Sequence, residues 1–203
     1  MEKRFAEFIS YIFHPLLMPT YLLVLFLNLP VFVFNEYSFN LKLMLTGYVF
    51  LLTFFVPAMM MLMMKKNKII RSLKMEERSE RMLPLAFMSV IYYITYYFLN
   101  RLGVLNIYSL FLLGTTLTTL ITMLINFRWK ISLHMIGVGG ISGVMVALAY
   151  QVSEINILWV YGVLFVSGLV AYARILTAQH TVRQLFYGYL LGFSIMFFLM
   201  VAI

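Results

Sequence analysis

The sequence predicts an all-α fold: a polytopic transmembrane helical bundle of about six to seven spans. First, 64% of the 203 residues are hydrophobic and 11% are charged, with a mean hydropathy of +0.97, and a soluble chain of this length could not bury so much apolar surface in one core. Second, the apolar runs are continuous and about 17–23 residues long, the length that a helix needs to cross ~30 Å of hydrocarbon. Third, they lack the alternation of membrane β-strands.

Seven apolar segments are expected to form a single integral membrane domain over residues 1–203. The first contains Pro15 and Pro19 and no small-residue cleavage pattern, which indicates a retained span rather than a signal peptide. The third and the fifth are short, and the fifth is rich in glycine, so both could tilt or re-enter. The segments are 8–29, 42–64, 83–100, 105–126, 135–151, 157–177 and 184–203.

The last segment contains two glycines, Gly188 and Gly192, in a GxxxG spacing. This spacing lets two helices approach closely. Packing within the chain is favoured over a dimer contact.

Basic residues are distributed very unequally between the two sides of the predicted bundle. Of the 15 Lys and Arg, all but Lys42 and Arg101 fall on the side of the N-terminus. The positive-inside rule then places this side in the cytoplasm, although cations gathered to bind an anion would give the same bias. The net charge of +8 is mostly one-sided, and without a soluble domain it does not indicate nucleic-acid binding. The loops on this side are 65–82, 127–134 and 174–183.

Three polar clusters fall on that same side. The first is Lys74–Arg81, in which Lys74, Arg78 and Arg81 would share one face if the stretch were helical. The second is Ser132-Leu133-His134, and the third runs from Arg174 to His180. Taken singly, such cations are commonly topology signals or lipid-headgroup contacts.

His14 lies inside the first span, before Pro15. An intramembrane histidine is a functional candidate by default. Because no partner for it is identifiable in the sequence, a packing or interfacial role is favoured.

Together, the three clusters have the residue types that phosphoryl transfer needs. Guanidinium and ammonium groups supply charge-assisted donors for phosphate oxygens. Two imidazoles can divide the reaction: one attacks phosphorus, and the other protonates the leaving oxygen. No metal and no other cofactor is required. The chain has no cysteine, which excludes thiolate metal sites, and no aspartate, which argues against a prenyltransferase that holds Mg²⁺ through paired aspartates.

The order and spacing of the clusters resemble the type 2 phosphatidic acid phosphatase superfamily, membrane lipid phosphatases related to vanadium haloperoxidases. The shared features are Lys74-x6-Arg81, Ser132-x-His134 and Arg174-x5-His180, within residues 74–184. The resemblance implies that His180 is the nucleophile that forms a phosphohistidine and that His134 is the acid toward the leaving group. It also implies that Lys74, Arg81, Ser132 and Arg174, with Arg78 beside them, bind the phosphate.

The chain departs from the family pattern at several of these positions. Met82 follows Arg81, Leu133 replaces a glycine, and Ala173 replaces a serine. The aspartate that would orient the nucleophilic histidine falls at Gln184, whose carbonyl could accept an N–H bond but brings no charge. In the serine-protease triad, replacing the equivalent aspartate with an amide costs about 10⁴ in kcat, so Gln184 predicts a slow enzyme, a recruited glutamate or none of this chemistry.

The sequence thus leaves two main functional hypotheses and a minor third. The first is a metal-independent membrane phosphatase that acts on a phospholipid phosphate or an isoprenoid (polyprenyl) diphosphate. The second is a weak or inactive relative that binds anionic headgroups of membrane lipids or serves as a subunit of a membrane complex. The third, a small transporter, depends on the threonines at 115–119 and on Glu154, but the spans offer no buried carboxylate.

Overall fold

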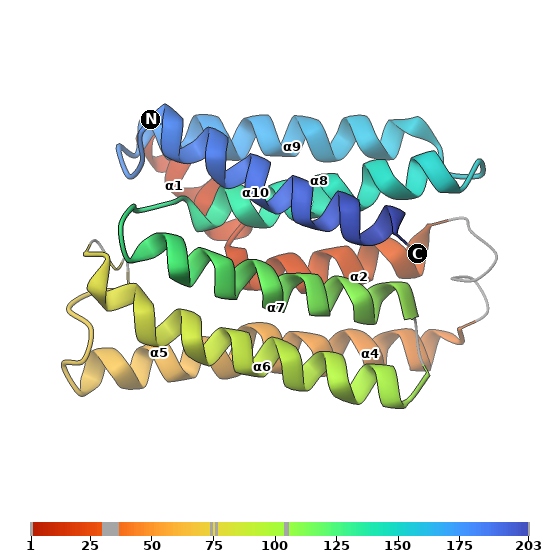
Figure 1. Ribbon diagram of the computed structural model, residues 1–203, viewed down its shortest axis with the longest axis horizontal. Coiled ribbons are helices and arrows are strands. Elements are labelled where there is room, and N and C mark those ends of the chain that lie inside the picture. The colour runs from red at the N-terminus through yellow and green to blue at the C-terminus, as the bar shows by residue number, and fades with distance from the viewer. Residues whose placement is uncertain (1, 30–36, 74, 76, 104–105, 203) are drawn as a thin grey trace. The chain divides into compact units, whose positions relative to one another are not determined.

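The computed structural model describes residues 2–29, 37–73, 75, 77–103 and 106–202 (Figure 1). Within these ranges the chain is all-helical, and seven helical segments are long and apolar enough to cross a membrane. By length and hydropathy, the protein is therefore a multi-pass helical membrane protein, as its composition predicts. The segments are Glu2–Asn28, Phe39–Lys66, Ser79–Arg101, Asn106–Asn126, Leu133–Gln151, Ile157–Leu176 and Val182–Val201.

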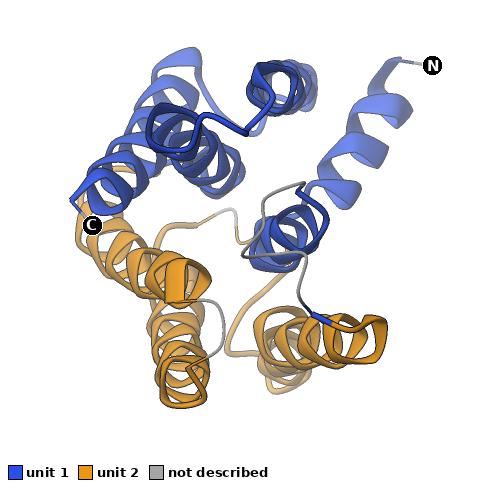
Figure 2. Cartoon of the chain, turned by 90° about the vertical axis from the view of Figure 1, so that its right-hand side faces the viewer, with its two compact units in different colours: residues 1–37, 131–203 blue, residues 38–130 orange. Residues whose placement is uncertain are grey.

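The chain divides into two compact units, coloured separately in Figure 2. Unit 1 consists of Met1–Tyr37 and Ile131–Ile203, and unit 2 consists of Ser38–Lys130. Unit 1 is therefore assembled from both ends of the chain.

The first span of unit 1 is broken into two helices. Helix α1 (Glu2–Ile12) is followed by the 3₁₀ turn η1 (Pro15–Leu17) and by α2 (Met18–Asn28). The break falls at His14, whose backbone is extended (φ −65°, ψ 137°), because Pro15 has no N–H to continue the ladder and disfavours helical geometry in the residue before it. A side chain satisfies the end of α1: the Tyr21 hydroxyl donates to the Ile12 carbonyl (2.8 Å).

The other three helices of unit 1 are α8 (Leu133–Gln151), α9 (Ile157–Leu176) and α10 (Val182–Val201). Helices α8 and α10 lie side by side (Figure 1). Glycines on both helices allow this contact: a Cβ at Gly192 would lie 2.1 Å from the Ile136 carbonyl oxygen, and a Cβ at Gly139 would lie 2.3 Å from that of Tyr189. The expectation that the GxxxG pair packs within the chain is therefore confirmed.

Unit 2 contains the helices α4 (Phe39–Phe50), α5 (Val56–Lys66), α6 (Met82–Arg101) and α7 (Asn106–Asn126). A π-helical segment, η2 (Leu51–Phe55), joins α4 to α5 immediately before Pro57. Since proline cannot donate the expected backbone hydrogen bond, the wider turn absorbs the mismatch without breaking the span.

The threonines of α7 are occupied by their own helix. Their hydroxyls donate to carbonyls four residues earlier, at 2.7–2.9 Å, for Thr115, Thr116, Thr118, Thr119 and Thr122. The donor hydrogens of these hydroxyls are therefore occupied within α7.

Candidate functional site

The second and third clusters meet in unit 1, where α8 and α10 begin. The backbone N–H of Ser132 donates to the Gln184 carbonyl (3.4 Å), and the Ser132 carbonyl lies 2.9 Å from the point where a Cβ on Gly188 would stand. Two helix N-termini therefore adjoin. Each contributes partial positive charge and backbone donors, so this end of the unit favours an anion.

His180 is oriented by Gln184 at the start of α10. The Gln184 Oε1 accepts from the Thr181 backbone N–H (3.1 Å) and lies 3.1 Å from His180 Nδ1. The Thr181 hydroxyl in turn accepts from the Gln184 N–H, which completes a capping box. Since a carbonyl oxygen can only accept, Nδ1 of His180 carries the proton, and Nε2 of the neutral ring carries the lone pair.

His134 lies in the first turn of α8 and bonds to the first span. Its Nε2 is 3.1 Å from the Ser10 carbonyl oxygen, so Nε2 carries the proton and Nδ1 of the neutral ring carries the lone pair. Arg174 contacts the same residue, because its Nη1 donates to the Ser10 hydroxyl (3.4 Å). Ser10 therefore links α8 to the end of α9.

His14 is a member of this cluster that sequence reasoning missed. Its ring lies edge-on to the His134 ring, with centroids 5.7 Å apart. Its Nδ1 accepts from the Leu16 N–H (3.3 Å), which assigns the proton of the neutral ring to Nε2. The packing role favoured from the sequence did not take this polar neighbour, His134, into account. The signal in the sequence is the His-Pro pair inside an apolar span, which breaks the helix beside an ionisable side chain.

Arg174 brings a positive charge into this region. It is half-buried, its Nε is buried without a hydrogen-bond partner, and the described residues place no carboxylate against it; their one ion pair joins Arg71 and Glu77 in unit 2. The Ser132 hydroxyl is also fully buried and without a partner. Because unpaired buried polar atoms and charges are costly, these donors are candidates for binding an anion.

The first cluster belongs to unit 2. The condition under which its cations would share one face is not met among the described residues: of these, only Ser79–Arg81 is helical, as the 3₁₀ turn η3, and Met75 has a positive φ of 44°. Lys74 itself lies outside the described residues. Positive φ in a non-glycine residue interrupts a helix, and no pattern of charges reveals it.

Both described arginines of the first cluster contact backbone carbonyls. Arg81 is buried (6% exposed) and its Nε donates to Met75 (3.0 Å). Arg78 donates to the Arg128 carbonyl, and its own carbonyl accepts from the buried Asn126 (2.8 Å). These contacts tie the start of α6 to the end of α7.

Within the described ranges, no group of three or more His, Asp or Glu side chains could hold a metal ion. Comparisons with protein-family models, with curated proteins and with solved structures find no match for this chain. The chemistry of the unit 1 cluster therefore has to be argued from its own residues.

Proposed function

We propose that the protein is a membrane phosphatase that hydrolyses a lipid phosphate or a polyprenyl diphosphate through a phosphohistidine on His180. The observation that carries this proposal is the pairing of unpartnered buried donors on Arg174 and Ser132 with a histidine whose tautomer is fixed. The resemblance of the three clusters to the type 2 phosphatidic acid phosphatases supports it.

The proposed reaction has two steps. The Nε2 lone pair of His180 attacks phosphorus, and the bond from phosphorus to the leaving oxygen breaks. Arg174 and Ser132 donate to the phosphate oxygens during this step, together with the Nε2–H of His14. Water then attacks the phosphohistidine, which releases inorganic phosphate and restores the imidazole.

His134 is the proposed acid toward the leaving oxygen. Because its Nε2–H is bonded to the Ser10 carbonyl, its Nδ1 would first take up a proton from the phosphate monoanion of the substrate and would then pass that proton to the leaving oxygen. From the charge bias of the loops we expect the reaction on the cytoplasmic side, whereas the sites of the family usually face away from the cytoplasm.

The decisive test is phosphate release by the full chain in lipid–detergent micelles, screened over lipid phosphates and polyprenyl diphosphates. The His180→Ala variant should lose the activity by several orders of magnitude, because the nucleophile is gone. Tyr187→Phe, an exposed position in the next turn of α10, is a matched control and should retain it. Activity that survives His180→Ala would overturn the assignment.

The second candidate is a weak or inactive relative that binds anionic headgroups or joins a membrane complex. The neutral Gln184 favours it, since an amide brings no negative charge to stabilise a charged His180 ring. In that case a lipid phosphate would bind without turnover, and binding would weaken in Arg174→Gln. A phosphate burst in the wild type would count against it.

A further inference from the structure

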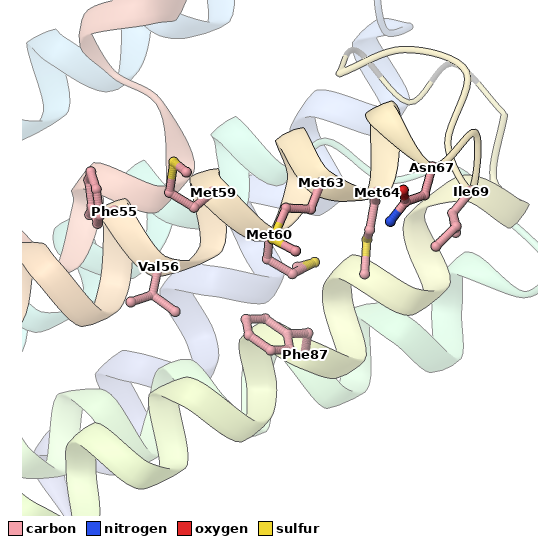
Figure 3. Close-up of a pocket in the computed structure, with 9 residues that line it drawn as sticks. All are labelled: Phe55, Val56, Met59, Met60, Met63, Met64, Asn67, Ile69 and Phe87. Atoms are coloured by element: carbon pink, nitrogen blue, oxygen red, sulfur yellow. The ribbon is translucent and has the colours of Figure 1, made fainter.

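Unit 2 has a groove along α5, near its C-terminal end. Its volume is about 430 Å³, and in Figure 3 the methionines of α5 lie opposite Phe87 of α6. None of the residues of the unit 1 cluster lines it. The lining residues are Phe55, Val56, Met59, Met60, Met63, Met64, Asn67, Ile69 and Phe87.

The groove suits a flexible apolar chain rather than a rigid ligand. Four of its lining residues are methionines, whose unbranched side chains adapt to irregular shapes. One side of the groove is open, as the 60% exposure of Met63 shows. Because Met63 lies on a membrane span, this side opens toward the hydrocarbon of the bilayer. Asn67, at the end of α5, is the one polar side chain of the lining.

A basic turn closes the polar end of the groove. Helix α5 ends on Lys65 and Lys66, and the chain then reverses at Lys68, which has a left-handed φ of 59°. The Lys68 N–H donates to the Lys65 carbonyl (3.1 Å) and the Ile69 N–H to the Met64 carbonyl (2.9 Å), the two bonds of a Schellman cap. This cap turns the chain back so that Ile69 lines the groove.

Lys68 occupies a position that normally favours glycine. A left-handed conformation is strained in a residue with a Cβ, whereas glycine adopts it freely. An outlier of this kind supports a hypothesis of function for the side chain. Here the Lys68 side chain adds a third cation to Lys65 and Lys66, all three are exposed, and the described residues place no carboxylate against any of them.

We propose that this groove binds an acyl chain of an anionic phospholipid while the lysines at its end bind the phosphate of the headgroup. The apolar groove and the cations lie in the order in which a phospholipid presents its tail and its charge. An uncharged lipid would fill the groove but gain nothing from the lysines. Each lysine near an anionic headgroup is worth about fivefold in affinity. The site goes beyond the proposed phosphatase and does not depend on turnover at His180.

The test uses a tryptophan inside the groove as a reporter. In the full chain, Phe87→Trp is combined with Trp129→Phe and Trp159→Phe, and the protein is reconstituted in phosphatidylcholine bilayers. Acyl-brominated phosphatidylglycerol should quench the reporter at a roughly hundredfold lower mole fraction than acyl-brominated phosphatidylcholine, because three lysines contribute about fivefold each. Equal quenching by the two lipids would overturn the proposal, since the groove would then hold any lipid of the surrounding bilayer.

Lys68→Gly provides the sharpest variant. It removes one cation but keeps the left-handed turn, so a lost preference cannot be attributed to unfolding. The preference for phosphatidylglycerol should fall about fivefold, and adding Lys65→Ala and Lys66→Ala should abolish it. Lys3→Ala, an exposed cation on α1, should leave it unchanged. An unchanged preference in Lys68→Gly would overturn the proposal.

Native mass spectrometry gives a second readout that needs no reporter. The wild-type chain should retain one phosphatidylglycerol more firmly than phosphatidylcholine, and the triple lysine variant should not. If the reporter variant fails to fold, this comparison decides the proposal by itself.

Discussion

Gln184 has two partners at the start of α10, the Thr181 N–H and His180 Nδ1. Because the Thr181 N–H is a donor, the Gln184 atom that it contacts must be the amide oxygen, Oε1. The same oxygen contacts His180 Nδ1, so Nδ1 carries the proton of the neutral ring. A neutral amide therefore orients the ring as a carboxylate would. What it lacks is the negative charge that would stabilise the charged imidazole of the proposed phosphohistidine.

Gln184→Glu should speed turnover by about tenfold or more. Glutamate has the same length, so it keeps both contacts while adding the missing charge, and in the serine-protease triad the converse loss costs about 10⁴. The measurement is kcat for phosphate release. Gln184→Met, which keeps the length and removes the acceptor, should be slower than wild type. If Gln184→Glu and Gln184→Met behave alike, this side chain has no part in the chemistry.

His14→Asn should weaken phosphate binding while leaving the fold intact. The asparagine side chain can still accept from the Leu16 N–H and so cap η1. It is too short, however, to place a donor where the His14 Nε2–H lies. Loss of one hydrogen bond to a charged group corresponds to about tenfold or more in affinity. Competition by orthovanadate, read as its inhibition constant, measures this. Unchanged inhibition together with an unchanged melting temperature would return His14 to a packing role.

At the scale of elements, the contact between α8 and α10 positions His134 and His180, because His134 lies in the first turn of α8 and His180 lies just before the first residue of α10. In this contact the backbone of one helix packs directly against the backbone of the other. Side chains cannot yield there, since the atoms nearest to the glycines are carbonyl oxygens.

Gly139→Ala should destabilise the protein by about 1–3 kcal/mol, the usual cost of overpacking, because its Cβ would lie 2.3 Å from the Tyr189 carbonyl oxygen. Gly162→Ala on α9 is the matched control: nothing lies within 4 Å of its Cβ, and alanine favours a helix by about 1 kcal/mol. Thermal unfolding in detergent compares the two. Equal melting temperatures would mean that α8 and α10 do not meet at these glycines.

The sequence predicts the spans better than it predicts their ends and interruptions. Long apolar runs specify each span, because the hydrocarbon thickness sets a minimum length. The break at His14 and the positive φ of Met75, before α6, depend instead on single residues. Pro15, which follows the extended His14, does not alter the hydropathy pattern of its span. The positive φ of Met75 leaves no trace in that pattern either.

The candidate site is predicted from the sequence only in part. Motif spacing identifies His134, Arg174, His180 and Gln184, which unit 1 brings close to one another. It does not identify His14 or Ser10, because their contacts join residues more than a hundred positions apart. Contacts at that separation depend on how α1 and α2 pack against α8 and α9, and hydropathy carries no information on such packing.

At the scale of the whole molecule, the seven spans predict where the loops lie. Two spans separate the first cluster from the second, and two more separate the second from the third, so all three should lie on one side of the membrane. The basic residues concentrate on that side, which the positive-inside rule assigns to the cytoplasm.

Single engineered cysteines test this arrangement without background, since the chain has no cysteine of its own. Lys68→Cys lies in the loop after the second span and Val152→Cys in the loop after the fifth, so an odd number of spans separates them. A membrane-impermeant maleimide added to intact cells should label position 152 and reach position 68 only after lysis. Labelling of both positions from outside would contradict the seven-span topology, because residues separated by an odd number of crossings cannot share a side. Labelling of position 68 alone would keep the topology but reverse its orientation, and the basic loops would then be explained by anion binding.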